Sequence, residues 1–191
     1  MTDHSEVLDV PYLTPSAQRI LEVASDLFYR HGIHAVGVDT IAAESGITKR
    51  TLYDRFESKD NLVAVYLKAR HASWWGRLEQ RLAEAAAPRT LAVFDAYAQD
   101  PLPSDRGCAF LNAAGELPPD HPAHPVIRAH KRAVRALLAD LVREDRPGLA
   151  DPDGTADELF LLLEGSVAHR GIDEGDTLTV RARERAARLL A

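Results

Sequence analysis

A short run of hydrogen-bond donors occupies residues 48–53, with the sequence TKRTLY. Lys49 and Arg50 are cations, and Thr51 and Tyr53 carry neutral hydroxyl donors. On the outer face of a helix, such side chains can donate to phosphate oxygens and to the edges of bases. This run therefore indicates a helix that could bind nucleic acid.

Two short helices joined by a tight turn would position these donors. The apolar spacing predicts helices at 38–44 and 49–55, with Gly46 in the turn and Thr48 as the N-cap of the second helix. The inner face would be apolar, formed by Ile41, Ala42, Ile47, Leu52 and Phe56. A helix-turn-helix has these features, although a solvated helix hairpin with surface lysines would share the local pattern.

The acidic composition does not exclude a nucleic-acid partner. The net charge is −6, but residues 14–70 hold eight lysines and arginines against seven acidic residues. Five of the eight cations fall between Lys49 and Lys68. The sequence therefore allows a local basic face on an acidic body.

Helical spacing continues through nearly the whole chain, and no alternating strand pattern of useful length occurs. We expect an all-α fold of about nine helices, in which a three-helix helix-turn-helix domain precedes a larger helical domain. The expected domains are a disordered lead-in at 1–13, the helix-turn-helix domain at 14–57 and the larger domain at 58–191. Capping signals place the first helix after Thr14 and a long helix after Ser58. The later helices are expected at 91–98, 108–117, 126–142, 155–171 and 176–190.

Two further features concern the cellular compartment in which the protein is found. The N-terminus lacks the basic and apolar segments of a secretion signal, and no apolar run approaches the roughly 20 residues of a membrane span. Cys108 is the only cysteine, so the chain can form neither an internal disulfide nor a cysteine-cluster metal site. We therefore expect a cytoplasmic protein without a membrane partner.

The wider run from Gly37 to Ala69 resembles the N-terminal DNA-binding domain of the TetR family of transcriptional regulators. The family's pattern is matched at Ile41, Ala42, Gly46, Ile47, Thr48, Thr51, Leu52, Tyr53, Phe56, Lys59 and Leu62. The resemblance covers about residues 16–68. The family commonly has Ser or Thr at the start of the second helix, where the hydroxyl meets a phosphate, whereas this chain has Gly37.

This resemblance assigns roles to the donors. It makes Thr48–Phe56 the recognition helix, with Lys49, Arg50 and Thr51 at the end that reaches base edges. The planar fork of Arg50 suits O6 and N7 of guanine. Tyr53 and Lys59 would contact phosphates, and Thr40 is a weaker candidate for such a contact.

A single half-site read by so few cations would bind weakly, so specific affinity calls for a dimer on a pseudo-palindromic operator. The run at 159–163 (LFLLL) covers more than one helix face, which either a partner chain or a fully internal helix would explain. The resemblance implies a homodimer built from the last two helices. The expected interface residues are Leu159, Leu162, Leu163 and Ser166.

The resemblance also implies that the chain after Trp74 forms a domain that receives a small-molecule effector. The expected pocket walls are Tyr66, Trp74, Trp75, Phe94, Tyr97, Phe110 and Leu111, and the possible polar anchors are Asn112, Glu116 and His130. Ordinary core packing is the alternative for each aromatic residue. No cofactor is expected.

Three other patterns allow sharper hypotheses. His121, His124 and His130 could ligate a metal, but most of them fall in a proline-rich loop without regular ligand spacing. Cys108 could sense redox state, although a single cysteine is more often a small, buried, apolar core residue. The basic run at 181–190 could be a second nucleic-acid patch or a solvated helix face.

The sequence therefore favours a ligand-responsive, dimeric DNA-binding repressor, and activation in place of repression stays open. The alternative is a helical enzyme or small-molecule-binding protein that keeps the helix-turn-helix only as a scaffold. No catalytic motif supports an enzyme. A purely structural module would leave the donors at 48–59 unexplained.

Overall fold

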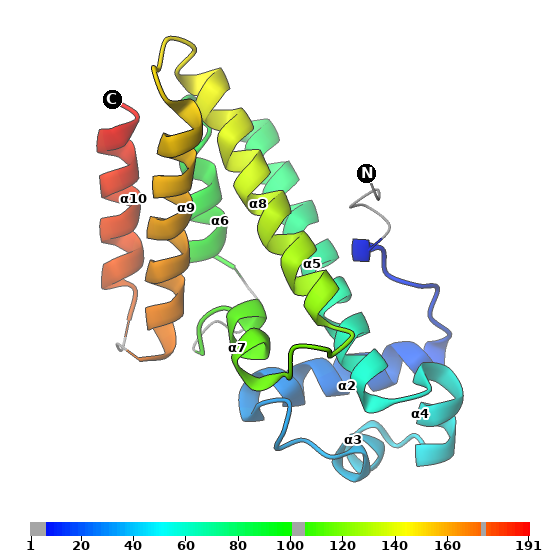
Figure 1. The fold of residues 1–191 in the computed structure, drawn as a ribbon. Coiled ribbons are helices and arrows are strands. Elements are labelled where there is room, and N and C mark those ends of the chain that lie inside the picture. The colour runs from blue at the N-terminus through cyan, green and yellow to red at the C-terminus, as the bar shows by residue number, and fades with distance from the viewer. Residues whose placement is uncertain (1–6, 101–105, 173–174) are drawn as a thin grey trace. The chain divides into compact units, whose positions relative to one another are not determined.

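The computed structural model describes residues 7–100, 106–172 and 175–191, and in these residues it contains helices and no strand (Figure 1). The all-α prediction is confirmed. Residues 1–6 of the expected lead-in and 101–105 of an expected loop lie outside this part of the chain. The helices are α2 (Pro15–His31), α3 (Val38–Ser45), α4 (Lys49–Phe56), α5 (Lys59–Glu84), α6 (Leu91–Ala98), α7 (Ala109–Glu116), α8 (His124–Asp145), α9 (Pro152–Ala168), the 3-10 helix η1 (His169–Gly171) and α10 (Thr177–Leu189).

The chain divides into two compact units. The first contains residues up to Ala72 together with Ala109–Ala129, and the second contains Ser73–Cys108 and His130–Ala191. The helix α7 therefore belongs to the same unit as α2, α3 and α4, although more than fifty residues separate it from α4 in the sequence. None of the described helices is long and apolar enough to cross a bilayer.

Local capping explains where the first helices begin and end. Thr14 accepts a hydrogen bond from the Ala17 N–H at 3.4 Å, and Pro15 occupies the first helical turn. Gly32 ends α2 with φ at 88°, a conformation that favours glycine. At α5, the Ser58 hydroxyl accepts from the Asn61 N–H at 3.0 Å. These N-caps are the ones that the sequence predicted.

The apolar stripes face the core of each unit. In α5 the residues at helical spacing are buried throughout, at Val63, Leu67, His71, Trp74, Leu78 and Leu82. In the first unit Ile20, Ile41, Leu52 and Leu62 are fully buried, so α2, α3, α4 and α5 share one core. Each such side chain contributes about 1.5–3 kcal/mol of hydrophobic stabilisation.

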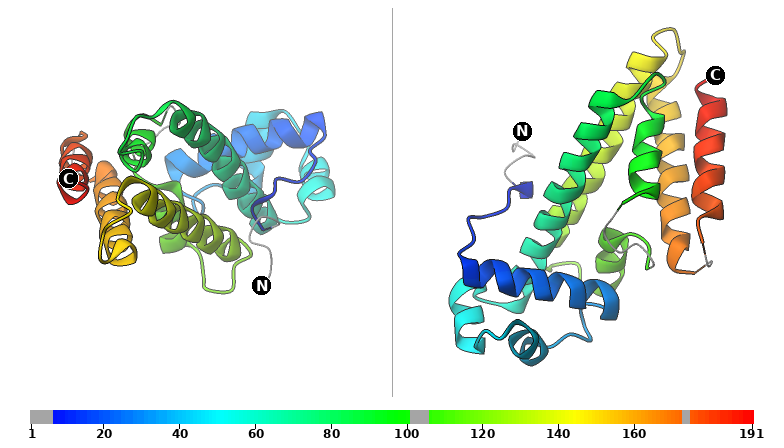
Figure 2. Two further views of the ribbon diagram at one scale, coloured as in Figure 1. Left: turned by 90° about the horizontal axis from the view of Figure 1, so that it is seen from above. Right: turned by 180° about the vertical axis from the view of Figure 1, so that it is seen from behind.

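In the second unit α10 packs against both α9 and α6 (Figures 1 and 2). The Asp145 carboxylate caps the N-terminus of α6, because it accepts from the Arg89 N–H, the Thr90 N–H and the Thr90 hydroxyl at 2.9, 2.8 and 2.6 Å. Arg170 holds the other end of α6 by donating to the main-chain oxygens of Tyr97 and Ala98 at 3.0 and 2.7 Å. Tertiary contacts thus fix both ends of this eight-residue helix.

Candidate nucleic-acid interface

A tight turn connects α3 to α4 in the first unit. Gly46 has φ 70° and ψ 15°, the left-handed conformation, and its N–H donates to the Ala43 carbonyl. Ser45 is buried, and its hydroxyl accepts from the Ile47 N–H at 3.3 Å. Thr48 then caps α4 by accepting from the Thr51 N–H at 3.2 Å. The turn thus fixes the direction in which α4 leaves α3.

The two faces of α4 differ sharply in exposure. Leu52 and Phe56 are buried against α2 and α3, as predicted. The Arg50 side chain is 92% exposed and lies 4.0 Å from Asp54, which is a loose contact. Tyr53 is 48% exposed. The helix therefore presents a guanidinium and a phenol to solvent from a rigidly anchored backbone.

Lys49 is engaged in an ion pair with Asp39 of α3. This contact raises the pKa of Lys49, through a hydrogen bond first and charge attraction second. Both side chains are exposed, and exposed pairs contribute about 0–1 kcal/mol, so a stronger anion could replace Asp39 at little cost. Thr40, also predicted as a contact, is exposed on the same helix as Asp39.

Lys59 has a structural contact that the sequence did not indicate. Its ammonium donates to the Ile33 carbonyl at 2.6 Å and lies 5.9 Å from the centre of the Phe28 ring. Partial burial lowers the pKa of Lys59, although Asp60 and Glu116 act in the opposite direction. Lys59 therefore ties the start of α5 to the segment that follows α2.

Gly37 occupies the N-cap position of α3. It makes no side-chain cap, its φ is −84°, and a Cβ atom added there would meet nothing within 4 Å. A serine or threonine would therefore fit at this position without strain. The glycine leaves the first N–H groups of α3 without a hydroxyl acceptor from residue 37.

This arrangement is shared with known regulators. The family model for bacterial regulatory proteins of the tetR family matches residues 20–66. A TetR-type transcriptional regulator from Streptomyces avermitilis is 31% identical, with a TM-score of 0.74, over 92% of this chain and 99% of that one. The chain belongs to the TetR family of transcriptional regulators.

Other structures of transcriptional regulators are also similar, the first of them from the TetR family. A regulator from Streptomyces coelicolor has a TM-score of 0.83 and 28% identity, over 92% of this chain and 94% of that chain. A transcriptional regulator from Saccharomonospora viridis, solved in complex with choline, has a TM-score of 0.77 and 22% identity, over 91% and 94% of the two chains. The family match includes α3, the turn and α4, so the DNA-binding helix-turn-helix inferred from the sequence is supported.

The residues predicted to line a pocket separate into two groups. Tyr66, Phe110, Leu111, Asn112 and Glu116 belong to the first unit of this TetR-family chain, and Trp74, Trp75, Phe94, Tyr97 and His130 belong to the second. In the first group, Tyr66, Asn112 and Glu116 line a cavity of about 10 Å³, which is about the room of one water molecule. This cavity is too small for an effector.

The second group contains an aromatic cluster around Trp74. Its ring centroid lies 4.8 Å from that of Tyr97 and 5.6 Å from that of His130, both with edge-to-face geometry. Phe94 is fully buried. Two predicted aromatic wall residues, Trp74 and Tyr97, and the predicted polar anchor His130 thus have rings in contact.

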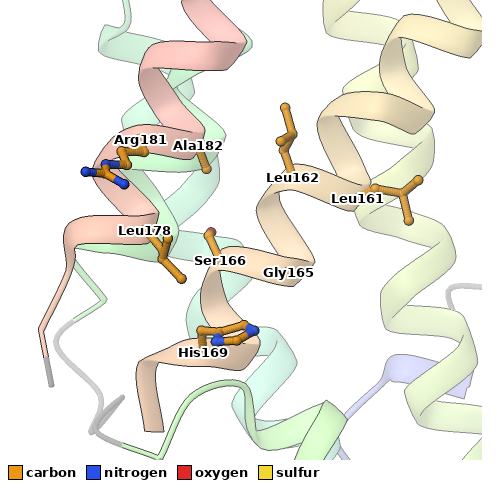
Figure 3. A pocket seen from close by; sticks show the side chains of 8 residues that line it. All are labelled: Leu161, Leu162, Gly165, Ser166, His169, Leu178, Arg181 and Ala182. Atoms are coloured by element: carbon orange, nitrogen blue, oxygen red, sulfur yellow. The ribbon is translucent and has the colours of Figure 1, made fainter. Parts of the chain in front are cut away.

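The predicted dimer residues also differ in placement. Leu159, Leu163 and Ser166 are buried within the second unit, and the Ser166 hydroxyl donates to the Leu163 carbonyl at 2.8 Å. Leu162 and Ser166 line a groove of about 340 Å³ between α9 and α10. In Figure 3, Leu178 and Ala182 of α10 point toward α9 across this groove. Leu161, also part of the lining, is 69% exposed.

The histidines do not form a metal cluster in the part of the chain that the structure describes. His121 lies 3.3 Å from Asp60, His124 lies 3.3 Å from the Leu117 carbonyl, and His130 packs on Trp74. Each histidine therefore has a separate environment.

Sequence reasoning missed a partly buried ion pair between Lys131 of α8 and Glu164 of α9. One signal was available, because Lys131 lies four residues after Ile127 and three before Val134, within the apolar stripe of α8. A cation on an apolar stripe indicates a buried partner.

Proposed function

We propose that the chain is a cytoplasmic, ligand-responsive repressor that binds a pseudo-palindromic operator as a homodimer. The exposure of Arg50 at the first turn of α4, while Leu52 and Phe56 anchor the same helix, is the observation that carries the proposal. A recognition helix needs this combination, because base reading requires free donors on a backbone that does not move.

Each donor has a role in this proposal. Arg50 reads a guanine through its two parallel N–H groups, and Lys49 and Thr51 reach neighbouring base edges. Tyr53, Thr40 and Lys59 bind phosphates; Lys59 does so with N–H groups other than the one given to Ile33. Lys49 exchanges Asp39 for DNA, which costs little because both side chains are exposed.

The groove between α9 and α10 supports the homodimer. It is mainly apolar, and Leu161, Leu178 and Val180 expose apolar surface on the two helices that form it. A second copy that covers this surface would give the regulator two α4 helices, as binding to a pseudo-palindrome with half-sites about 34 Å apart requires. Dimerisation thereby doubles the number of contacts to the operator.

An effector would bind in the second unit and favour a dimer whose two α4 helices no longer match the operator spacing. The aromatic cluster of Trp74, Tyr97 and His130 supports this location. The choline complex of the Saccharomonospora viridis regulator supports a small-molecule effector in general.

Footprinting of the intergenic DNA beside the chain's own gene tests the proposal, followed by affinity measurements over a range of salt concentrations. We expect protection of an inverted repeat and affinity that falls steeply with salt. Arg50→Ala should cost about 1–3 kcal/mol per half-site and relax the preference for guanine. Arg55→Ala is the matched control, since it removes an exposed cation from the same helix. Equal loss in both variants, or none, would remove Arg50 from the reading role.

A further inference from the structure

The segment that forms α3, the turn and α4 carries no net charge. Residues 38–56 contain three cations and three acids, which are Lys49, Arg50, Arg55, Asp39, Glu44 and Asp54. Binding to phosphates is driven by cations that displace counterions from DNA. A segment without net charge therefore gains little from phosphates alone, and the positions of its acids decide which cations are free to act.

Two of these acids lie beside the two cations at the start of α4. Asp39 Oδ1 forms an ion pair with Lys49 Nζ, and this contact joins α3 to α4. Asp54 Oδ2 lies 4.0 Å from Arg50 Nε, one turn along α4 itself. The hydrogen bond to Asp39 and its charge raise the pKa of Lys49. Lys49 is therefore neutralised by a close partner, whereas Arg50 has only a loose one.

Asp39 is also open to solvent. It is the second residue of α3, and its side chain is 80% exposed. The two helices pack against each other in the first unit (Figure 1). Because the carboxylate and the Lys49 ammonium are in contact at an exposed site, a DNA strand that reaches Lys49 also meets the negative charge of Asp39.

We propose that Asp39 determines specificity by weakening the binding of DNA that lacks the operator sequence. This inference rests on the proposed function, in which α4 reads an operator. On other DNA the contacts are mainly to phosphates, which repel the Asp39 carboxylate and compete with it for Lys49. Each chain thereby loses the benefit of one cation in complexes without base reading.

On the operator the same carboxylate gains a donor. Lys49 leaves Asp39 for a base edge at little cost, because both side chains are exposed. The N4 amine of cytosine is the major-groove donor that carboxylates accept from. Asp39 then accepts from a cytosine next to the base that Lys49 contacts. A charge that is repelled by the wrong DNA and paired by the right one increases the difference between the two affinities.

Affinities for the footprinted operator and for a random-sequence duplex of the same length test the proposal, measured by fluorescence anisotropy over a range of salt concentrations. Asp39→Asn keeps the size of the side chain and an acceptor oxygen but removes the charge. We expect about three- to tenfold tighter binding to the random duplex. Its salt slope should steepen by about 0.9 per subunit, because Lys49 then neutralises one phosphate.

Operator affinity should change by no more than about twofold in Asp39→Asn, since Lys49 has already left residue 39 in that complex. The ratio of operator to random-duplex affinity should therefore fall by about threefold or more. Unchanged affinity for the random duplex, or a ratio that does not fall, would overturn the proposal.

Two controls separate this role from a general effect of charge. Asp26 pairs with Arg30 at an exposed site of α2, so Asp26→Asn changes the net charge equally. It should leave the random-duplex affinity within about twofold, and a gain equal to that of Asp39→Asn would refute the proposal. In a Lys49→Met background, Asp39→Asn should tighten random binding less. An equal gain there would show that Asp39 does not act through Lys49.

Base preference tests the contact to cytosine. Substitution of each operator base pair in turn should reveal one position per half-site where the wild type prefers cytosine and Asp39→Asn relaxes toward adenine, the base that an amide suits. The same preferences in both proteins would remove Asp39 from this contact.

The random-duplex measurements also keep the two proposals apart. If footprinting detects no operator, the proposed function fails, and the random-duplex affinities still decide whether Asp39 screens Lys49. If an operator is bound but Asp39→Asn leaves the affinity ratio unchanged, the proposed function stands and the role of Asp39 is refuted.

Discussion

Glu116, at the end of α7, is hydrogen-bonded to His34, which lies in the segment between α2 and α3. Its Oε2 accepts from the His34 backbone N–H at 3.1 Å, and its carbonyl oxygen lies 2.6 Å from His34 Nε2. A carbonyl oxygen can only accept, so the imidazole carries a proton on Nε2. The sequence assigned Glu116 to an effector pocket, but its carboxylate already has a partner within the first unit.

Glu116→Ala should therefore act on DNA binding. Loss of one of these hydrogen bonds costs about 1 kcal/mol and loosens the residues that precede α3, so we expect operator affinity to fall several-fold. Fluorescence anisotropy with labelled operator measures the change, and Glu116→Gln, which keeps an acceptor oxygen, is the control. Unchanged affinity in Glu116→Ala would show that the contact does not position the helix-turn-helix.

Gly37→Ser should restore the hydroxyl that this chain lacks at the start of α3. The backbone conformation is ordinary and the space is open. We expect a few tenths of a kcal/mol of added stability from the N-cap, and about two- to tenfold tighter operator binding per half-site from one added phosphate contact. Thermal denaturation and anisotropy measure the two effects. Gly37→Ala, which adds a Cβ without a hydroxyl, should not tighten binding.

Leu161→Glu should dissociate the proposed dimer without unfolding the chain. The side chain is 69% exposed in a single copy, so the folding free energy of that copy should change by less than about 0.5 kcal/mol. Sedimentation velocity should show a monomer, and operator affinity should fall with it. Ala136→Glu places the same charge on an exposed position of α8 and should leave both unchanged. A dimeric Leu161→Glu protein would argue for another interface.

Asp145→Ala should destabilise the second unit. The carboxylate caps α6 through two N–H groups and one hydroxyl, and Thr90 is fully buried, so its donors would lose their acceptor. We expect a loss of about 2 kcal/mol in the free energy of unfolding, measured by urea denaturation. The neighbouring Glu144→Gln should cost no more than about 0.5 kcal/mol, because its carboxylate pairs with Arg89 at an exposed site. Similar losses in the two variants would contradict the capping role.

Much of the DNA-binding unit could be predicted from sequence. Thr14, Gly32, Thr48 and Ser58 act within one helical turn, so their capping roles follow from residue type and neighbours alone. The apolar stripe of α5 has the period of a helix, so its buried face also follows from the sequence.

The contacts that define the rest of the molecule join residues far apart in the chain. His34 and Glu116 are 82 positions apart, and Lys131 and Glu164 are 33 apart. Neither the type of a residue nor its place in a helical repeat reveals which distant side chain it will contact. The packing of several helices against one another decides those contacts. The sequence alone therefore determined that the chain is helical, where α2, α4 and α5 begin, and which donors α4 carries on its outer face. The tertiary structure decided that Glu116 holds His34 and that Cys108 lies beside the partly buried ammonium of Lys131, since both contacts require separate parts of the chain to meet.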